Sequence, residues 1–310
     1  MGLQLPKRVV GNHGTARRVT TLAALGVGML VLGGCSAGTD NQWERFGMPD
    51  PASEQGEHIL GLWQGAWIAA LITGVIVWGL IFYAIFHFRR RSADEIPIQT
   101  RYNLPLEIFY TIAPIIMVIV FFAHTVKVQN VVLDDERPID NCMEVTGQQW
   151  SWTFNYGIGE MGNCDAVEPD STTFPYASYV HDSGTGSHIP TLVMPVNETT
   201  RFNLHSPDVI HDLGVPAFLM KMDVIPGRIN HYEITPTRIG SYVGKCYELC
   251  GVYHSRMLFN VEVVSAEDYD AYLQRLQDAG AETEAPLLGG EFASTQAGLD
   301  DGTNSEEGAE

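Results

Sequence analysis

Basic residues are scarce in this chain of 310 residues. It holds 18 Lys and Arg against 37 Asp and Glu, which leaves a formal net charge of −19. This balance excludes nucleic acid as a partner, because the phosphates would be repelled. It suits a cationic protein partner, which such a charge attracts over long range. Residues 281–310 contain neither Lys nor Arg, and this acidic, weakly hydrophobic stretch predicts a disordered tail.

The first apolar run of the chain lacks the length to cross a membrane. It covers residues 19–32, and a spanning helix needs about 20 residues. A short apolar run after a basic segment is typical of a secretion signal. The run ends in Leu32-Gly33-Gly34-Cys35, which resembles the lipobox of bacterial lipoproteins. We therefore expect a signal peptide over 1–34, a lipidated Cys35 and a polar linker over 35–54.

Two later apolar runs, 59–88 and 106–126, are long enough to span a bilayer. They predict a transmembrane hairpin over 55–127. The loop between them carries Arg89, Arg90, Arg91 and Arg101. Because basic loops stay in the cytoplasm, we expect Cys35 and the rest of the chain on the outer face of a bacterial cytoplasmic membrane.

From residue 128 onward the pattern changes to short alternating runs with turn residues between them. Such runs predict strands of a sandwich or barrel; they cover 142–145, 148–156, 200–206, 228–234, 241–245 and 257–264. A Gly-, Ser- and Asp-rich segment, 157–190, reads as an insertion that is passive or contacts a partner. Helical spacing over 266–280 predicts a helix after this domain of 128–265.

A cluster of soft donor residues follows in the run Cys246-Tyr-Glu-Leu-Cys250-Gly-Val-Tyr-His254-Ser-Arg-Met257. Thiolate, imidazole and thioether together favour copper. A mononuclear blue-copper site needs only one Cys, so the second thiolate indicates two metals bridged by sulfur. With every position filled by protein, such a site transfers electrons. A structural zinc site is the alternative, but zinc does not explain Met257.

The segment from Ser206 to Met257, which also contains His211 and Lys221-Met-Asp-Val-Ile-Pro-Gly227, resembles subunit II of the haem–copper cytochrome c oxidases. The resemblance covers roughly residues 55 to 265. It implies a two-helix transmembrane hairpin followed by an all-β cupredoxin-like Greek-key barrel. It also implies a binuclear copper centre, CuA, whose ligands are His211, Cys246, Cys250, His254, Met257 and the backbone carbonyl of Glu248.

The resemblance implies three further roles. The carboxylate of Glu248 would bind Mg²⁺ or Mn²⁺ at the boundary with subunit I, as suits a hard cation. Trp150, in an aromatic run from Gln148 to Tyr156, would receive electrons at the docking surface. Glu107 would stand at the entrance of a proton channel; alternatively, it is a helix N-terminal carboxylate favoured by the helix dipole.

The expected function is that of the electron-entry subunit of a proton-pumping oxidase that reduces oxygen to water. Electrons would come from cytochrome c or from a c-type cytochrome of a bc complex and pass to haem in subunit I, with subunit III also present. Asp208, Asp212 and Asp223 would attract a basic cytochrome face, and Val215, Pro216, Phe218 and Leu249 would keep water from the copper. A nitric oxide reductase subunit and a copper-delivery lipoprotein remain alternatives.

Five cysteines are present. Lipid would take Cys35 and copper would take Cys246 and Cys250. Cys142 and Cys164 remain, on the oxidising side of the membrane where disulfides persist. We expect these two to be bonded.

Overall fold

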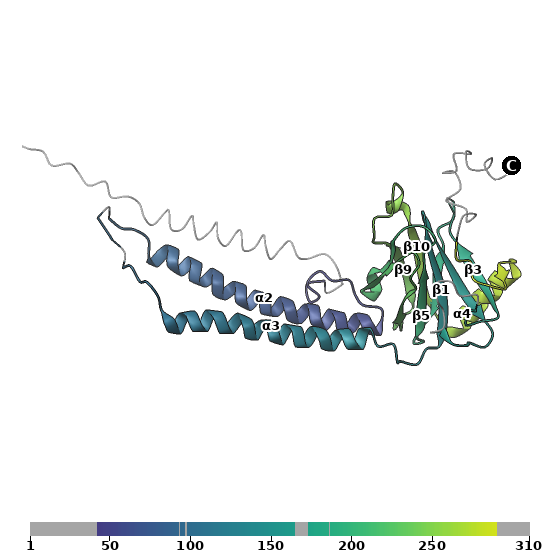
Figure 1. Ribbon diagram of the computed structural model, residues 1–310, viewed down its shortest axis with the longest axis horizontal. Coiled ribbons are helices and arrows are strands. Elements are labelled where there is room, and N and C mark those ends of the chain that lie inside the picture. Colours follow the sequence, from purple (N-terminus) through teal and green to yellow (C-terminus); the bar gives the residue numbers. More distant parts are fainter. Residues whose placement is uncertain (1–41, 93, 97, 165–172, 186, 290–310) are drawn as a thin grey trace, which may run out of the picture. The chain divides into compact units, whose positions relative to one another are not determined.

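A computed structural model describes residues 42–92, 94–96, 98–164, 173–185 and 187–289 (Figure 1). The expected signal peptide, Cys35 and residues 290–310 lie outside this part of the chain. Within it, two long helices precede an all-β domain. The predicted hairpin and β domain are therefore confirmed.

The hairpin consists of α2 (Glu54–His87) and α3 (Leu104–Val132), which run side by side (Figure 1). Ser53 caps α2 by accepting the Gly56 N–H, and Asn103 caps α3 by accepting the Leu106 N–H. Such caps satisfy amides that the first turn leaves free. Both helices begin before the predicted apolar runs, at the capped polar residues, and α3 also continues past its run to Val132. Most large apolar side chains of both helices are exposed, as expected of lipid-facing segments.

The β domain is a sandwich of two sheets. One has the order β11-β3-β2-β1-β5-β8 and the other β4-β10-β9-β6-β7. The strands of the first sheet are β1 (Asn141–Gln148), β2 (Ser151–Ile158), β3 (Ser178–Ser183), β5 (Thr200–His205), β8 (Asn230–Ile234) and β11 (Glu282–Thr283). Those of the second are β4 (Thr191–Pro195), β6 (His211–Val215), β7 (Met220–Val224), β9 (Gly240–Cys246) and β10 (Leu258–Val264). Two parallel pairs, β1 with β5 and β4 with β10, require long connections.

Aromatic side chains from facing strands fill the space between the sheets. Trp152 and Phe154 of β2 both contact the ring of Phe259 of β10, at centroid distances of 5.6 and 5.3 Å. All three are buried. The helix α4 (Ala266–Asp278) adds Tyr269 and Tyr272 against Tyr156 at one edge of this core. This aromatic core supports the loops at the ends of the strands.

Two predicted irregular segments contain ordered strands. The expected insertion 157–190 includes β3, which pairs with β2 along its length. Cys142 of β1 and Cys164 of this segment form a disulfide with a Cα–Cα distance of 6.0 Å. The expected tail 281–310 begins with β11, paired with β3, and Leu287 exchanges hydrogen bonds with Asn155. Disorder from residue 281 is thus wrong for residues 281–289.

Two strand boundaries also differ from the prediction. The expected strand 148–156 is broken by a turn, so that Trp150 lies between β1 and β2. His211, which none of the predicted strands includes, is the first residue of β6. The strands β4, β6 and β7 were not predicted. Four of the five residues in β4 and all five in β6 are buried, so neither shows the alternation by which a half-exposed strand is found.

The end of the hairpin is bound to the β domain by backbone hydrogen bonds. The Ala52 N–H donates to the Ala217 carbonyl at 2.7 Å, and the Glu54 N–H donates to the Thr235 carbonyl at 3.0 Å. Ser53 also donates its hydroxyl to the Phe218 carbonyl at 3.0 Å. This contact lies directly after β6, the strand that begins with His211.

Candidate metal centre

The predicted donor residues come from two places in one sheet. His211 begins β6, and the others belong to the loop between β9 and β10. The Cys246 N–H donates to the Met257 carbonyl at 3.0 Å, which closes the two ends of this loop. Gly251 turns the loop at φ +126°, where a side chain is strained, and an added Cβ would lie 3.0 Å from the Trp150 ring. The loop therefore brings donors up to eleven positions apart into one volume.

All the predicted donors are brought together. The two thiol sulfurs of Cys246 and Cys250 are 3.9 Å apart. His211 Nδ1 is 4.0 Å from the Cys246 sulfur, and His254 Nδ1 is 3.5 Å from the Cys250 sulfur. The Met257 sulfur lies 3.8 Å from the Cys250 sulfur. The Glu248 carbonyl oxygen lies 3.2 Å from the Cys246 sulfur. Each thiol thus has its own imidazole.

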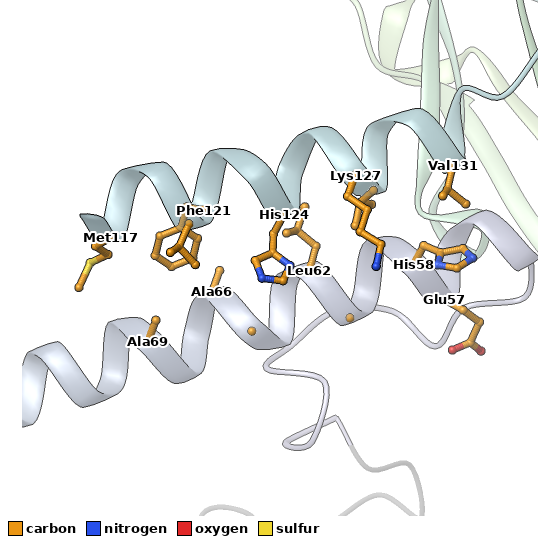
Figure 2. Close-up of a pocket in the computed structure, with 14 residues that line it drawn as sticks. Glu57, His58, Leu62, Ala66, Ala69, Met117, Phe121, His124, Lys127 and Val131 are labelled. Carbon is orange, nitrogen blue, oxygen red and sulfur yellow. The ribbon is translucent and has the colours of Figure 1, made fainter. Parts of the chain in front are cut away.

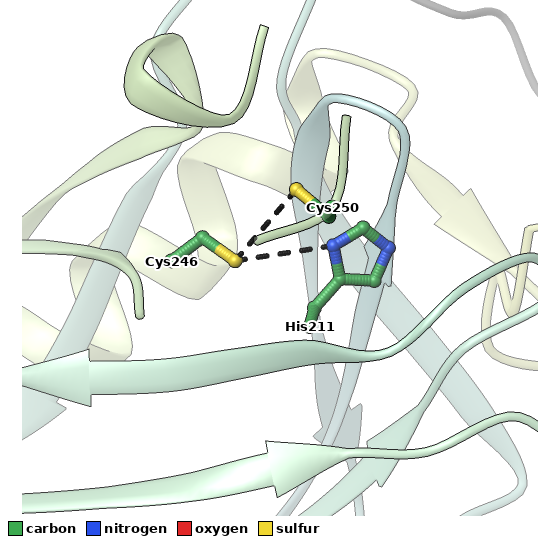
Figure 3. A group of neighbouring side chains, drawn as sticks. All are labelled: His211, Cys246 and Cys250. Atoms are coloured by element: carbon green, nitrogen blue, oxygen red, sulfur yellow. Dashed lines mark hydrogen bonds between the residues drawn. The ribbon is translucent and has the colours of Figure 1, made fainter. Parts of the chain in front are cut away.

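The three donors at the centre of this group are buried. Ligand atoms of His211, Cys246 and Cys250 lie within 4.8 Å of one another, and Figure 3 shows both the Cys250 sulfur and the His211 ring directed at the Cys246 sulfur. Met257 is buried as well, and His254 is half-buried. The site is thus closed on the domain side and borders the surface at His254.

Burial and hydrogen bonding make the two thiols unequal. Burial opposes ionisation of Cys246, but hydrogen bonding to His211 and to backbone amides outweighs it, so the pKa of Cys246 is lower than usual. Burial, together with the charge of Cys246, raises the pKa of Cys250 to about 12. Cys246 is the more readily ionised sulfur. Since a metal binds thiolates, metal binding would remove the proton of Cys250.

Asp208 holds the far side of the His211 ring. Its carboxylate accepts His211 Nε2 at 2.9 Å and the Gln149 N–H at 2.7 Å. Burial lowers the pKa of His211, but the Asp208 carboxylate and Cys246 raise it further, and the net shift is upward. Such a partner sets which ring nitrogen is free to bind a metal. The sequence analysis assigned Asp208 only to the docking surface. Its position three residues before His211 could have indicated that it orients the His211 ring.

Trp150 is hydrogen-bonded to the backbone of Cys250, a predicted ligand. Its Nε1 donates to the Cys250 carbonyl at 3.1 Å, and the Gln149 side-chain amide donates to the same oxygen at 2.7 Å. The Trp150 ring is half-buried and contacts Tyr253 at a centroid distance of 5.0 Å. The turn at 149–150 therefore contacts the ligand loop and Asp208 together. The contribution of Gln149 was not foreseen.

Two expectations about the surroundings of the site are wrong. Leu249 is 77% exposed, so it does not shield the donors, whereas Val215 and Phe218 are buried. Asp212 is also buried, and it accepts a hydrogen bond from Lys221 at 2.7 Å. Burial raises the pKa of Asp212 despite that lysine. This carboxylate cannot meet a partner protein, while Asp223 is exposed.

The remaining predicted residues lie apart from the donors or at their edge. The side chain of Glu248 is exposed, while its carbonyl faces Cys246. Glu107 lies in the first turn of α3, where its carboxylate accepts the Asn103 N–H at 2.9 Å. That contact is the helix N-terminal arrangement considered as the alternative for Glu107. Cys35 lies outside the described residues.

Comparison with known proteins gives matches along most of the chain. The family model for the transmembrane domain of cytochrome c oxidase subunit II matches residues 41–128, and the model for its periplasmic domain matches residues 142–264. The chain is similar to a probable cytochrome c oxidase subunit 2 of Streptomyces avermitilis, with 47% identity over 279 residues, 84% of this chain and 87% of the relative.

A second relative and a solved structure extend the comparison. The cytochrome c oxidase subunit 2 of Mycobacterium bovis is 33% identical over 324 residues, which cover 90% of this chain and 88% of the relative. The crystal structure of the periplasmic domain of subunit II of cytochrome oxidase from Bradyrhizobium japonicum matches with 26% identity and a TM-score of 0.37. It covers 46% of this chain and 97% of that one.

Proposed function

The chain belongs to the cytochrome c oxidase subunit II family, and from this premise we propose that it is the electron-entry subunit of a respiratory oxidase. It would accept electrons from cytochrome c, or from a c-type cytochrome of a bc complex, through a binuclear copper centre. They would pass to haem in subunit I, where oxygen is reduced to water and protons are pumped. Subunit III would complete the complex.

The pairing of each thiol with its own imidazole carries this proposal. Cys246 lies beside His211 and Cys250 beside His254, while the sulfurs are 3.9 Å from each other. Two sulfurs between two nitrogens suit two bridged metals better than one. The buried Met257 sulfur at 3.8 Å supports copper, for which a thioether is a usual weak ligand and which zinc does not require.

When bound, the copper pair would supply one-electron redox chemistry. The residues of the chain would hold the ligands in one geometry: Asp208 through the His211 ring, and Gln149 and Trp150 through the Cys250 carbonyl. A set of ligands held in this way needs little rearrangement when the charge changes. Trp150, half-buried beside the ligand loop, would present its ring to the donor.

The remaining roles are proposed on the family resemblance. The exposed carboxylate of Glu248 would bind Mg²⁺ or Mn²⁺ together with subunit I, and Glu107 would lead protons towards a channel in that subunit. Lipidated Cys35 would anchor the chain on the outer face of the cytoplasmic membrane. The β domain would lie on that face, where the Cys142–Cys164 disulfide persists.

The test of the copper centre is an electron paramagnetic resonance spectrum, with copper analysis, of the full chain purified in detergent. We expect two coppers per chain and a seven-line hyperfine pattern, because one unpaired electron would be shared by both metals. A single copper with four lines, or zinc alone, would overturn the proposal. It would leave a mononuclear or structural site in this loop.

Replacing Trp150 by Leu is expected to weaken the encounter with reduced cytochrome c. A tryptophan at the centre of an interface commonly contributes about 2 kcal/mol, so KM for the cytochrome should rise roughly 30-fold. Steady-state cytochrome oxidation by the purified complex measures this. Trp43→Leu, at a 68% exposed tryptophan near the hairpin, is the matched control. An unchanged KM with an intact copper spectrum would place electron entry elsewhere.

A further inference from the structure

A cavity of about 720 Å³ opens between the two helices of the hairpin. Its walls come from residues 57–69 of α2 and residues 117–131 of α3. Figure 2 shows Ala66 and Leu62 of α2 facing Phe121 and His124 of α3 across it. Its volume lies within the range of roughly 300–1,000 Å³ that is usual for small-ligand sites.

Glycines in α2 leave this space open. Small residues in membrane helices normally allow two backbones to pack closely. Here, however, a Cβ added to Gly61 or Gly65 would meet nothing within 4 Å. These glycines therefore do not serve the α2–α3 contact. The space beside them belongs to something other than the described residues of this chain.

The polar residues of the cavity lining lie at its end nearer the β domain. Near the β domain the lining carries His58 from the start of α2 and His124 and Lys127 from the end of α3. Further from the β domain it consists of apolar residues such as Ala69 and Met117 (Figure 2). An occupant must be amphiphilic, with its polar end towards the β domain.

Tryptophan side chains lie beside the polar end of the cavity. Trp63 and Trp67 belong to the same stretch of α2, and both rings are partly exposed. Trp67 also stacks on Phe46, at a centroid distance of 5.8 Å. Tryptophan side chains gather where hydrocarbon gives way to headgroups. We therefore expect lipid headgroups at this end of the cavity.

The basic side chains at this end have no partner in the described part of the chain. Neither His58, His124 nor Lys127 forms a hydrogen bond or ion pair with any residue that the structure describes. The one carboxylate of the lining, Glu57, points away from α3 in Figure 2. The ammonium group of Lys127, at the edge of the bilayer, attracts the phosphate of a lipid headgroup. A phosphate placed here would supply the opposite charge.

From this combination we infer that the cavity is a binding site for one phospholipid. The phosphate lies against His58, His124 and Lys127, and an acyl chain runs past Gly65 towards Met117. A lipid molecule matches the polarity of the cavity from one end to the other. A helix from another protein would leave Lys127 with its charge unmatched unless it carried an acidic residue at that level. This site is independent of the copper centre.

The test measures bound lipid in the purified oxidase complex by native mass spectrometry. The complex is delipidated in detergent and then titrated with phosphatidylglycerol. Gly65→Leu fills the open space and should remove one tightly bound lipid per complex. Gly79→Leu is the matched control, since Gly79 also lies in α2 with nothing within 4 Å of an added Cβ, yet outside the cavity lining. It should leave the lipid count unchanged.

Lys127→Gln keeps the shape of the cavity and removes its charge. Phosphatidylglycerol should then bind about tenfold more weakly, because a hydrogen bond to a charged group contributes on that order. An unchanged lipid count and affinity in both cavity variants would overturn the inference. So would the loss of another subunit from the Gly65→Leu complex at a constant lipid count, since a protein helix would then be the occupant.

Discussion

Serine in place of Cys250 is expected to remove the binuclear centre. The hydroxyl is a harder donor than the thiolate and does not bridge two coppers. Copper per chain should fall from two to at most one, and the seven-line signal should disappear. Electron transfer from cytochrome c should fall by more than the roughly 10–100-fold that follows from changing partners behind the ligands. Copper analysis, the resonance spectrum and stopped-flow kinetics measure these effects.

Glu248→Gln is the matched control for this variant. Glu248 contributes its backbone carbonyl, 3.2 Å from the Cys246 sulfur, while its side chain is exposed. Removing the carboxylate charge should leave the copper content and spectrum unchanged. A binuclear signal that persists in Cys250→Ser, or disappears in Glu248→Gln, would contradict the assigned ligands.

Leucine in place of Glu233 is expected to destabilise the β domain strongly. Glu233 of β8 lies opposite Arg201 of β5, and its carboxylate accepts the Arg201 Nε at 2.6 Å. Both side chains are almost completely buried, at 2% and 1% exposure. Without the carboxylate the buried guanidinium loses this ion-pair partner, and breaking a buried ion pair costs about 3–5 kcal/mol. Denaturant unfolding of the full chain in detergent, followed by tryptophan fluorescence, measures the loss.

Two further variants separate burial from charge. The double variant Arg201→Met with Glu233→Leu should recover most of the stability, because apolar residues of similar volume replace the pair. Arg238→Met breaks the exposed pair with Asp50 and should cost at most about 1 kcal/mol. Equal losses in Glu233→Leu and Arg238→Met would show that burial does not decide the energy of the Arg201 pair.

The hairpin could be predicted because its signal is local. A membrane-spanning helix satisfies its own backbone hydrogen bonds and needs only about 20 apolar residues. The donor residues could likewise be recognised from their types and spacing, since Cys246 to Met257 fall in a single loop. That loop needs only the turn at Gly251 and the closing bond between Cys246 and Met257 to gather them.

The sequence-based predictions of secondary structure were wrong where distant segments of the chain decide the local structure. Residues 281–289 are polar and acidic, yet β11 pairs with β3 and Leu287 binds Asn155, so their backbone is ordered by partners more than 100 positions away. The strand β6 is buried throughout and lacks alternation. The turn at Trp150 interrupts an aromatic pattern that otherwise reads as one strand.

The sequence by itself determined that two helices cross a membrane and that soft donors gather near one loop, because hydrophobic length and ligand chemistry are properties of neighbouring residues. Only the tertiary structure decided that Asp208 orients His211, that Gln149 and Trp150 both bind the Cys250 carbonyl, and that Asp212 is buried against Lys221. These contacts join separate elements of the chain, and the packing of two sheets determines which polar groups meet and which are removed from water.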